Sequence, residues 1–292
     1  MTNFGDGAMT TGMMIWTWYE GTWHQGNFPV MGASDHGAWL GSSVFDGARA
    51  FEGTAPDLDL HCKRVVDSAG VMGLNAPMDA EEITELAREG IGKVSKDTAL
   101  YIRPLMWARG GGPSMVIPDP DSTAFALSLE ARPMAEPTGF SITTTPYSRP
   151  MNSMAPTDAK AGCLYPNNAR MLRAAFAKGF DNAVSLDPLG NVAETATSNI
   201  WMVKDGVALT PVPNGTFLNG ITRKRVLKLL REDGIEVHET TITLDQLRDA
   251  DEIFSTGNAQ KVVPITRFDD REYAYGPIAK RARALYWEFS HQ

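Results

Sequence analysis

Residues 159–165 read Ala-Lys-Ala-Gly-Cys-Leu-Tyr and place one lysine, Lys160, among small residues just before a predicted helix. A phenol, Tyr165, follows five residues later. On their own these two residues carry little weight, because most lysines in globular proteins lie at the surface. Their meaning depends on which other groups the rest of the chain supplies.

Three later segments supply such groups. Glu194 lies in Val192-Ala-Glu-Thr-Ala-Thr-Ser-Asn199, between a turn and a strand. Gly220-Ile-Thr-Arg223 opens an amphipathic helix, whose first amides can bind a phosphate. Thr256-Gly-Asn-Ala259 follows a strand-like run, and its small residues permit a second anion site on backbone amides. A pyridoxal-5′-phosphate (PLP) enzyme needs this set: an imine-forming lysine, a carboxylate for the pyridine nitrogen, a phenol for the ring oxygen and phosphate-binding amides.

The order and spacing of these segments resemble the fold-type IV PLP-dependent aminotransferases, specifically the branched-chain amino acid aminotransferase-like subgroup. The resemblance runs from about Trp39 to Trp287. Further short matches are Gly41-Ser-Ser-Val-Phe-Asp-Gly47 with Ala48-Arg49, His61-Cys-Lys-Arg64, Tyr101-Ile-Arg-Pro104, and Thr256-Gly257 with Pro264.

This resemblance implies a role for each matching residue. Lys160 would be the catalytic residue that forms the Schiff base and moves the proton, and Glu194 would face the pyridine nitrogen. The implied cofactor-binding residues are Arg64, Lys160, Tyr165, Glu194, Ile221, Thr222, Thr256, Gly257 and Asn258. The implied substrate-binding residues are Phe45, Gly47, Arg49, Tyr101, Arg103 and Ala259. Because Lys160 must be neutral to accept a proton, we expect burial beside the cationic cofactor ring to lower its pKa.

The implied activity is a ping-pong, Schiff-base transfer of an amino group between a branched-chain or related L-amino acid and 2-oxoglutarate. Three features depart from the subgroup pattern: Leu40 replaces a tyrosine, the loop Gly110–Ser114 is unusual, and Asn258-Ala-Gln260 replaces threonine–alanine–alanine. The alternatives on the same fold are a D-amino-acid or (R)-amine transaminase and aminodeoxychorismate lyase. A non-catalytic PLP-binding protein is the alternative from another class.

The resemblance also implies an α/β (α+β) fold of two domains. We expect a smaller α+β domain over 1–131, a linker over 132–139 that is rich in proline, and a larger PLP-binding domain over 140–292 that is β-barrel-like and flanked by helices. Periodicity predicts helices over 60–73, 79–94, 168–178 and 222–233 and from Pro277 onward. It predicts strands over 14–20, 22–24, 99–108, 122–131, 140–145, 183–187, 200–203, 207–210, 235–240 and 253–255.

The composition and net charge of the chain indicate which binding partners to expect. The chain has 292 residues and a formal net charge of −8, which disfavours nucleic acid and anionic membranes as partners. The five histidines show no metal-ligand spacing, so we expect no metal. Cys62 and Cys163 are expected to be small buried residues of a reduced, cytoplasmic protein. The family pattern implies a homodimer or a larger homo-oligomer that acts on amino acids and 2-oxo acids.

Overall fold

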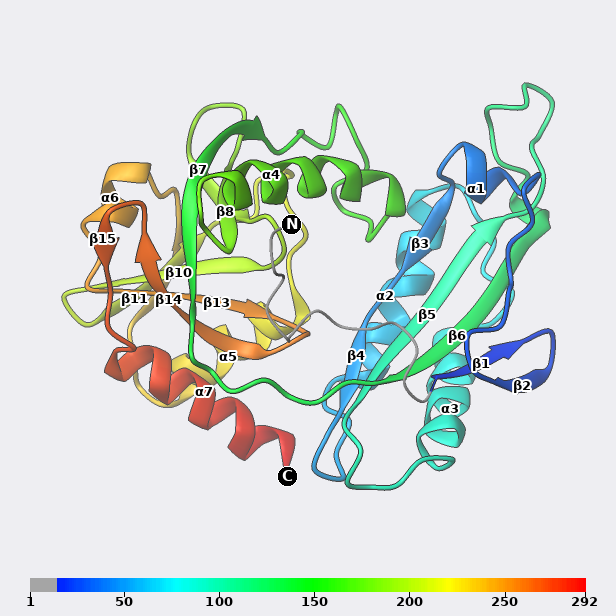
Figure 1. The fold of residues 1–292 in the computed structure, drawn as a ribbon, viewed down its shortest axis with the longest axis horizontal. Coiled ribbons are helices and arrows are strands. Elements are labelled where there is room, and N and C mark those ends of the chain that lie inside the picture. Colours follow the sequence, from blue (N-terminus) through cyan, green and yellow to red (C-terminus); the bar gives the residue numbers. More distant parts are fainter. Residues whose placement is uncertain (1–14) are drawn as a thin grey trace.

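The computed structural model describes residues 15–292, which form two β-sheets side by side (Figure 1). The first sheet contains β1 (Ile15–Tyr19), β2 (Thr22–Gln25), β3 (Ser43–Phe45), β4 (Ala48–Ala50), β5 (Leu100–Ala108) and β6 (Thr123–Ala131). Its order is β2-β1-β6-β5-β3, and β4 also pairs with β5. All of these pairings are antiparallel.

Two helices cover one face of this sheet. They are α2 (Leu58–Val71) and α3 (Ala80–Ile91), which pack against each other and against β5. Val65, Ile83 and Ile102 are fully buried between the helices and the sheet. The start of α3 is fixed by a capping box between Asp79 and Glu82, in which each side chain accepts from the other residue's backbone amide. A short helix, α1 (His36–Trp39), precedes β3.

The second sheet has nine strands. They are β7 (Phe140–Ser148), β8 (Asn182–Leu186), β9 (Val192–Thr195), β10 (Asn199–Lys204), β11 (Val207–Pro211), β12 (Val237–Thr240), β13 (Glu252–Gly257), β14 (Lys261–Phe268) and β15 (Arg271–Glu272). The order is β12-β11-β10-β13-β14-β7-β8-β9, with β15 paired to β14. Because β9 also packs against β10 and β11, the sheet curls into a half-barrel.

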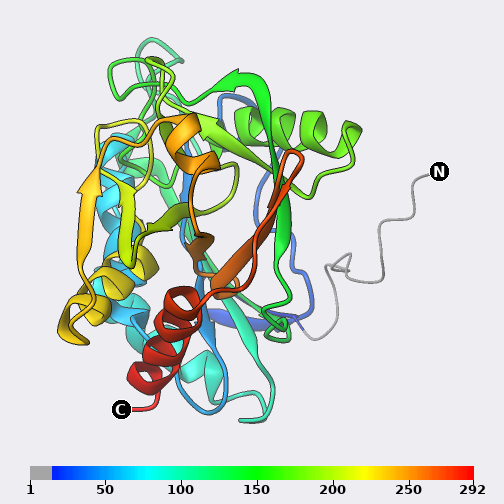
Figure 2. The ribbon, with the colours of Figure 1, turned by 90° about the vertical axis from the view of Figure 1, so that its left-hand side faces the viewer.

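Four helices accompany the second sheet. Helix α4 (Tyr165–Ala177) packs on β7 and β8, whereas α5 (Ile221–Glu232) and α7 (Pro277–Ser290) pack on β13. Figure 2 shows α5 and α7 next to each other beside the half-barrel. Helix α6 (Leu244–Arg248) is a single short segment, and two 3-10 turns cover Pro120–Ser122 and Gly162–Leu164. None of the helices within residues 15–292 has the length and apolar content needed to cross a membrane.

The structure confirms the mixed α+β fold that the sequence predicts. The segment 132–139 between the two sheets contains no helix or strand. The division into two domains at this segment stays a prediction. The first residue of the predicted strand 14–20 lies outside the described residues.

Several elements were absent from the prediction. They are α1, α6, β3, β4, β9, β14 and β15. The most important is β14, a central strand whose Pro264 breaks the usual strand pattern. The cysteine prediction was half wrong, because Cys62 is buried but Cys163 is exposed.

Candidate active site

Two hydrogen bonds hold the main chain of Lys160, one to helix α2 and one to strand β3 of the first sheet. Its backbone amide donates to Ser68 Oγ of α2 at 3.1 Å, and its carbonyl accepts from the amide of Phe45 at 3.1 Å. The next residue, Ala161, forms an isolated β-bridge with Val44. Lys160 therefore lies where the second half of the chain meets the first sheet.

The side chain of Lys160 enters a cavity of about 380 Å³ between the two sheets. All predicted site residues line this cavity except Arg49 and Arg103. The lysine Nζ donates a hydrogen bond to Tyr165 Oη at 2.8 Å and lies 4.8 Å from the centre of the Phe45 ring. A nucleophilic amine, a phenol and an aromatic face thus share one point of the cavity.

The protein groups around Lys160 by themselves shift its pKa upward. Burial lowers it, but the phenol of Tyr165 and the carboxylate of Asp46 outweigh that effect, so the pKa is raised above its ordinary value. The protein groups alone therefore keep this amine protonated. Any lowering of its pKa has to come from a positive charge that binds nearby.

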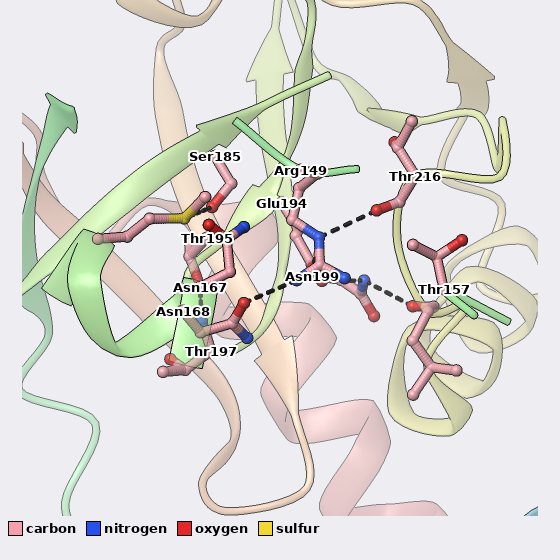
Figure 3. Close-up of polar contacts among 12 residues, drawn as sticks. Arg149, Thr157, Asn167, Asn168, Ser185, Glu194, Thr195, Thr197, Asn199 and Thr216 are labelled. Atoms are coloured by element: carbon pink, nitrogen blue, oxygen red, sulfur yellow. Dashed lines mark hydrogen bonds and ion pairs between the residues drawn. The ribbon is translucent and has the colours of Figure 1, made fainter. Parts of the chain in front are cut away.

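Glu194 lies on β9, is buried and lines the cavity. Figure 3 shows it close to Arg149 and Asn199. Arg149 Nε lies 3.3 Å from Glu194 Oε1, and Asn199 Nδ2 donates to Glu194 Oε2 at 3.4 Å. Burial raises the pKa of Glu194 to about 7, although Arg149 and Lys160 lower it. This carboxylate is consequently suited to pair with a cationic or hydrogen-bearing nitrogen.

Arg149, which sequence reasoning missed, is itself fixed on two further sides. Its Nε donates to the carbonyl of Thr216 at 2.9 Å, and its Nη1 donates to Asn168 Oδ1 at 2.7 Å (Figure 3). The residue is buried at the end of β7. A buried arginine with these bonds holds the Glu194 carboxylate in one place. The predicted strand ended at residue 145, so no sequence signal marked Arg149 as part of the site.

Asn199 connects Glu194 to the start of α5. Its Oδ1 accepts from the amide of Gly220 at 3.2 Å, and its Nδ2 also donates to the carbonyl of Leu218 at 3.1 Å. A Cβ on Gly220 would lie 2.2 Å from Asn199 Oδ1, so any larger residue there would displace the Asn199 amide. No side chain caps α5. The first amides of α5, at Ile221 and Thr222, therefore face the cavity beside the positive end of the helix dipole.

The turn after β13 offers a second set of donors. Thr256 Oγ1 accepts from Trp201 Nε1 at 2.9 Å, which leaves its own hydrogen for another acceptor. Asn258 Oδ1 accepts from Lys261 Nζ at 2.8 Å, and the buried Asn258 Nδ2 has no acceptor among residues 15–292. Thr256, Gly257 and Asn258 all line the cavity. This turn can bind an anion.

Arg64 lines the cavity but is already paired. Its Nε and Nη2 donate to the two oxygens of Asp46 at 2.6 and 2.8 Å. His61 Nδ1 lies 2.7 Å from the same carboxylate. Arg64 and His61 hold the pKa of the fully buried Asp46 well below its usual range, against the effect of burial. Sequence reasoning missed Asp46 and His61, although both lie in quoted segments.

Three arginines surround Tyr101. Arg49 is fully buried behind the cavity, where it donates to the carbonyls of Ala259 and Arg132. Arg103 is paired with Glu130 at 3.3 Å and does not line the cavity. Arg132, which was assigned to the linker, does line it.

Of the three features that depart from the subgroup pattern, Asn258-Ala-Gln260 contributes Asn258 and Ala259 to the cavity, and the other two lie away from it. Leu40 is partly exposed at the end of α1, and the loop 110–114 belongs to a projecting segment. Neither contributes a residue to the lining. His36 ties that loop to α1, because its Nε2 lies 3.0 Å from the carbonyl of Met115.

A two-sheet fold with a lysine, a phenol and a buried carboxylate around one cavity defines an enzyme of the aminotransferase type. The family model described as class IV amino-transferases matches residues 43–268, and the chain belongs to this family. The sequence-based resemblance and the prediction of an aminotransferase are confirmed.

Individual relatives agree. The branched-chain-amino-acid aminotransferase of Pseudomonas aeruginosa is 33% identical over 286 residues, which cover 93% of this chain and 91% of the relative. A crystal structure of an aminotransferase from Brucella abortus, bound to PLP, superposes with a TM-score of 0.95 at 59% identity and covers 96% of this chain and 100% of that chain. The branched-chain amino acid aminotransferase of Escherichia coli superposes with a TM-score of 0.87 at 28% identity, with 95% of each chain covered.

Proposed function

We propose that this aminotransferase uses PLP to move an amino group between a branched-chain or related L-amino acid and 2-oxoglutarate, in two successive half-reactions. The observation that supports this most directly is the contact between Lys160 Nζ and Tyr165 Oη, in the cavity that Glu194 also lines. Relatives at about a third identity carry the name branched-chain-amino-acid aminotransferase.

The residues of the cavity fit PLP. Asn258 Nδ2 is a buried donor that needs an acceptor, and the uncapped start of α5 supplies amides for a phosphate. Glu194, with its pKa of about 7, is matched to a pyridine nitrogen. Bound PLP supplies an aldehyde that condenses with amino groups and a ring that accepts the electron pair released at an α-carbon.

Lys160 would hold and move the proton at Nζ. Its amine must be neutral for this task, and the protein groups around it favour the charged form. Tyr165 Oη, at 2.8 Å, can take the hydrogen bond in either state and orient the amine. Glu194, braced by Arg149, would keep the nearby nitrogen protonated.

The remaining roles are proposed by position. Ile221, Thr222, Thr256, Gly257, Asn258 and Arg64 would bind the cofactor phosphate or its surroundings, since all line the cavity. Phe45, Gly47, Tyr101 and Ala259 would contact the substrate on the same grounds. Arg49 and Arg103 would act from behind the lining: Arg49 by holding Ala259, and Arg103 by packing against Tyr101.

We also propose a cytoplasmic homodimer. The loop after β5 projects from the body of the protein (Figure 1) and exposes Met115, Val116 and Ile117 by 65%, 70% and 60%. Three consecutive exposed apolar residues favour contact with another subunit. Light scattering should give twice the chain mass, and replacing Val116 with glutamate should shift the equilibrium toward the monomer.

Activity assays test the proposed substrate. Leucine, valine, D-alanine and (R)-1-phenylethylamine would each be supplied with 2-oxoglutarate, and glutamate formation would be measured. We expect turnover with leucine and valine. Turnover of only the last two donors would replace the proposal with a D-amino-acid or (R)-amine transaminase, and pyruvate release from aminodeoxychorismate would indicate the lyase.

The lysine assignment has an optical test. The purified protein with PLP should absorb in the visible range and lose that absorbance when an amino donor is added. Lys160→Ala should abolish the borohydride-reducible bond between protein and PLP. A bond that persists in this variant would mean that another lysine carries the cofactor.

A further inference from the structure

The hairpin between β13 and β14 carries a lysine at a position that costs free energy. Gly257 and Lys261 are register partners on either side of residues 258–260. Lys261 has a φ of 66°, in the left-handed region where glycine is the least strained residue and where short hairpin loops often have one. A long side chain at this position therefore strains the backbone in a way that glycine would avoid.

The side chain of Lys261 is also buried, with only 1% of its surface exposed. Its Nζ donates to Asn258 Oδ1 at 2.8 Å and forms no ion pair within residues 15–292. The nearest favourable charge, on Asp57, is already paired with Arg225, and Arg49 adds a second positive charge nearby. Lys261 thus combines a strained backbone and a buried charge with a single polar partner, Asn258.

This one bond orients the Asn258 amide. A protonated lysine has three N–H donors and no acceptor, so the end of the amide that faces it must be the oxygen. The other end, Asn258 Nδ2, is buried and has no acceptor in the part of the chain that the structure describes. Asn258 lines the cavity beside Thr256 and Gly257. The lysine therefore leaves one buried donor available to a group that binds in the cavity.

The departure of this turn from the subgroup pattern gives the lysine a purpose. Asn258 stands where the pattern has a threonine. A hydroxyl can rotate to suit an acceptor, whereas an amide has two distinct ends and needs a partner that selects one of them. Lys261 is such a partner.

From this geometry we propose that Lys261 is a positioning residue, which holds the Asn258 amide so that Nδ2 donates to the phosphate of PLP. The proposal rests on the proposed role of this turn in binding the cofactor. Lys261 does not line the cavity, so it acts through Asn258 and not by contact with the cofactor. Its positive charge also polarises the amide and strengthens the bond that Nδ2 donates.

The test compares PLP with pyridoxal, which lacks the phosphate. Both aldehydes can be titrated into the enzyme while the absorbance of the imine is followed. Lys261→Met keeps the length of the side chain but removes its donor. This variant should weaken PLP binding by about 10–100-fold, the loss expected for a hydrogen bond to a charged group, and pyridoxal binding by less than about threefold. Its Tm without PLP should not fall, because a buried charge has been removed.

A double-mutant cycle separates positioning from general packing. In the Asn258→Ala background, Lys261→Met should change the Kd of PLP by less than about threefold, because the residue through which the lysine acts is gone. Lys261→Gln, which can still donate to Asn258 Oδ1, should give a smaller loss than Lys261→Met. It also serves if Lys261→Met folds poorly.

Arg283→Met is the matched control, because Arg283 supports the same hairpin through its main chain. Its Nη1 donates to the carbonyls of Gln260 and Val262 at 3.1 and 2.9 Å. Loss of these bonds leaves the contact between Lys261 and Asn258 in place. The Kd of PLP should therefore change by less than about threefold.

Four results would overturn the proposal: unchanged PLP binding in every folded Lys261 variant, an equal loss for pyridoxal, the same loss in the Asn258→Ala background, or the same loss in Arg283→Met. Failure of the proposed function would look different. In that case the wild-type enzyme would transfer no amino group from leucine or valine, although its binding of PLP and pyridoxal would still report on Lys261.

Discussion

Lys261 Nζ donates a hydrogen bond to Asn258 Oδ1 at 2.8 Å, and this lysine is fully buried. Burial and the nearby Arg49 lower its pKa to about 7, against the opposing effect of Asp57. The bond also fixes which end of the Asn258 amide faces the cavity. A buried cation beside another cation is costly to keep, so its removal should be measurable.

The first prediction concerns Lys261→Met and the pH dependence of stability. Between pH 7 and the ordinary lysine pKa of 10.5, the unfolded chain binds a proton that the folded chain does not, so this group makes stability rise with pH. Lys261→Met should remove that rise and stabilise the protein at pH 6 by about 1–3 kcal/mol. Urea unfolding at pH 6, 7.5 and 9 would check this. Parallel stability curves for the two proteins would contradict it.

The second prediction concerns Glu194→Gln in the apoprotein. The folded-state pKa of about 7 exceeds the ordinary value of 4.5. Between these values the folded chain binds a proton that the unfolded chain has lost, so the group makes stability fall as pH rises. Glu194→Gln should therefore raise Tm more at pH 8 than at pH 5. Glu239→Gln, at an exposed glutamate outside the cavity, is a control that should lack this trend.

The third prediction concerns the buried group of Asp46, His61 and Arg64. Asp46→Asn leaves the largely buried Arg64 charge uncompensated and should cost about 3–5 kcal/mol at pH 7. Because the pKa of Asp46 is lowered, this contribution is present above the unfolded-state pKa and is lost in strong acid. Chemical denaturation of both single variants and of Asp46→Asn with Arg64→Met forms a double-mutant cycle. Additive losses would mean that the pair is not coupled.

The fourth prediction concerns the close approach of Gly47 and Tyr101. A Cβ on Gly47 would lie 2.1 Å from Tyr101 Oη, so Gly47→Ala must displace the ring. We expect a loss of about 1–3 kcal/mol from overpacking and weaker substrate binding. Adding Tyr101→Ala should make the alanine at 47 nearly neutral relative to Tyr101→Ala alone. Thermal unfolding of the four proteins measures this; an equal cost of Gly47→Ala in both backgrounds would exclude the clash.

Local signals predicted much of the fold. Asp205-Gly206 predicted the hairpin between β10 and β11, and both residues have positive φ, at 50° and 80°. Gly234 predicted the end of α5 and also has a positive φ, of 83°. By contrast, β14 was missed because Pro264 lies in a central strand, where proline is rare.

The residues of the site likewise fall into those that the sequence could predict and those that only the fold reveals. Residues in matching short segments, such as Lys160 and Glu194, could be proposed from order and spacing. Their supporting partners could not, since Arg149 and Glu194 lie 45 positions apart in the chain and only the fold brings them together. Arg132 was hidden because its proline-rich surroundings indicated a linker, whereas the residue lines the cavity.

The hydrogen bonds of the Lys160 main chain to Ser68 and Phe45 have a consequence for protein engineering. The reactive amine is positioned by residues from the opposite side of the 132–139 segment. A chain cut within that segment should yield two inert fragments, each lacking part of the lysine's support. Colour and turnover would return only when the fragments associate, so the cut protein could report on the proximity of two fused partners.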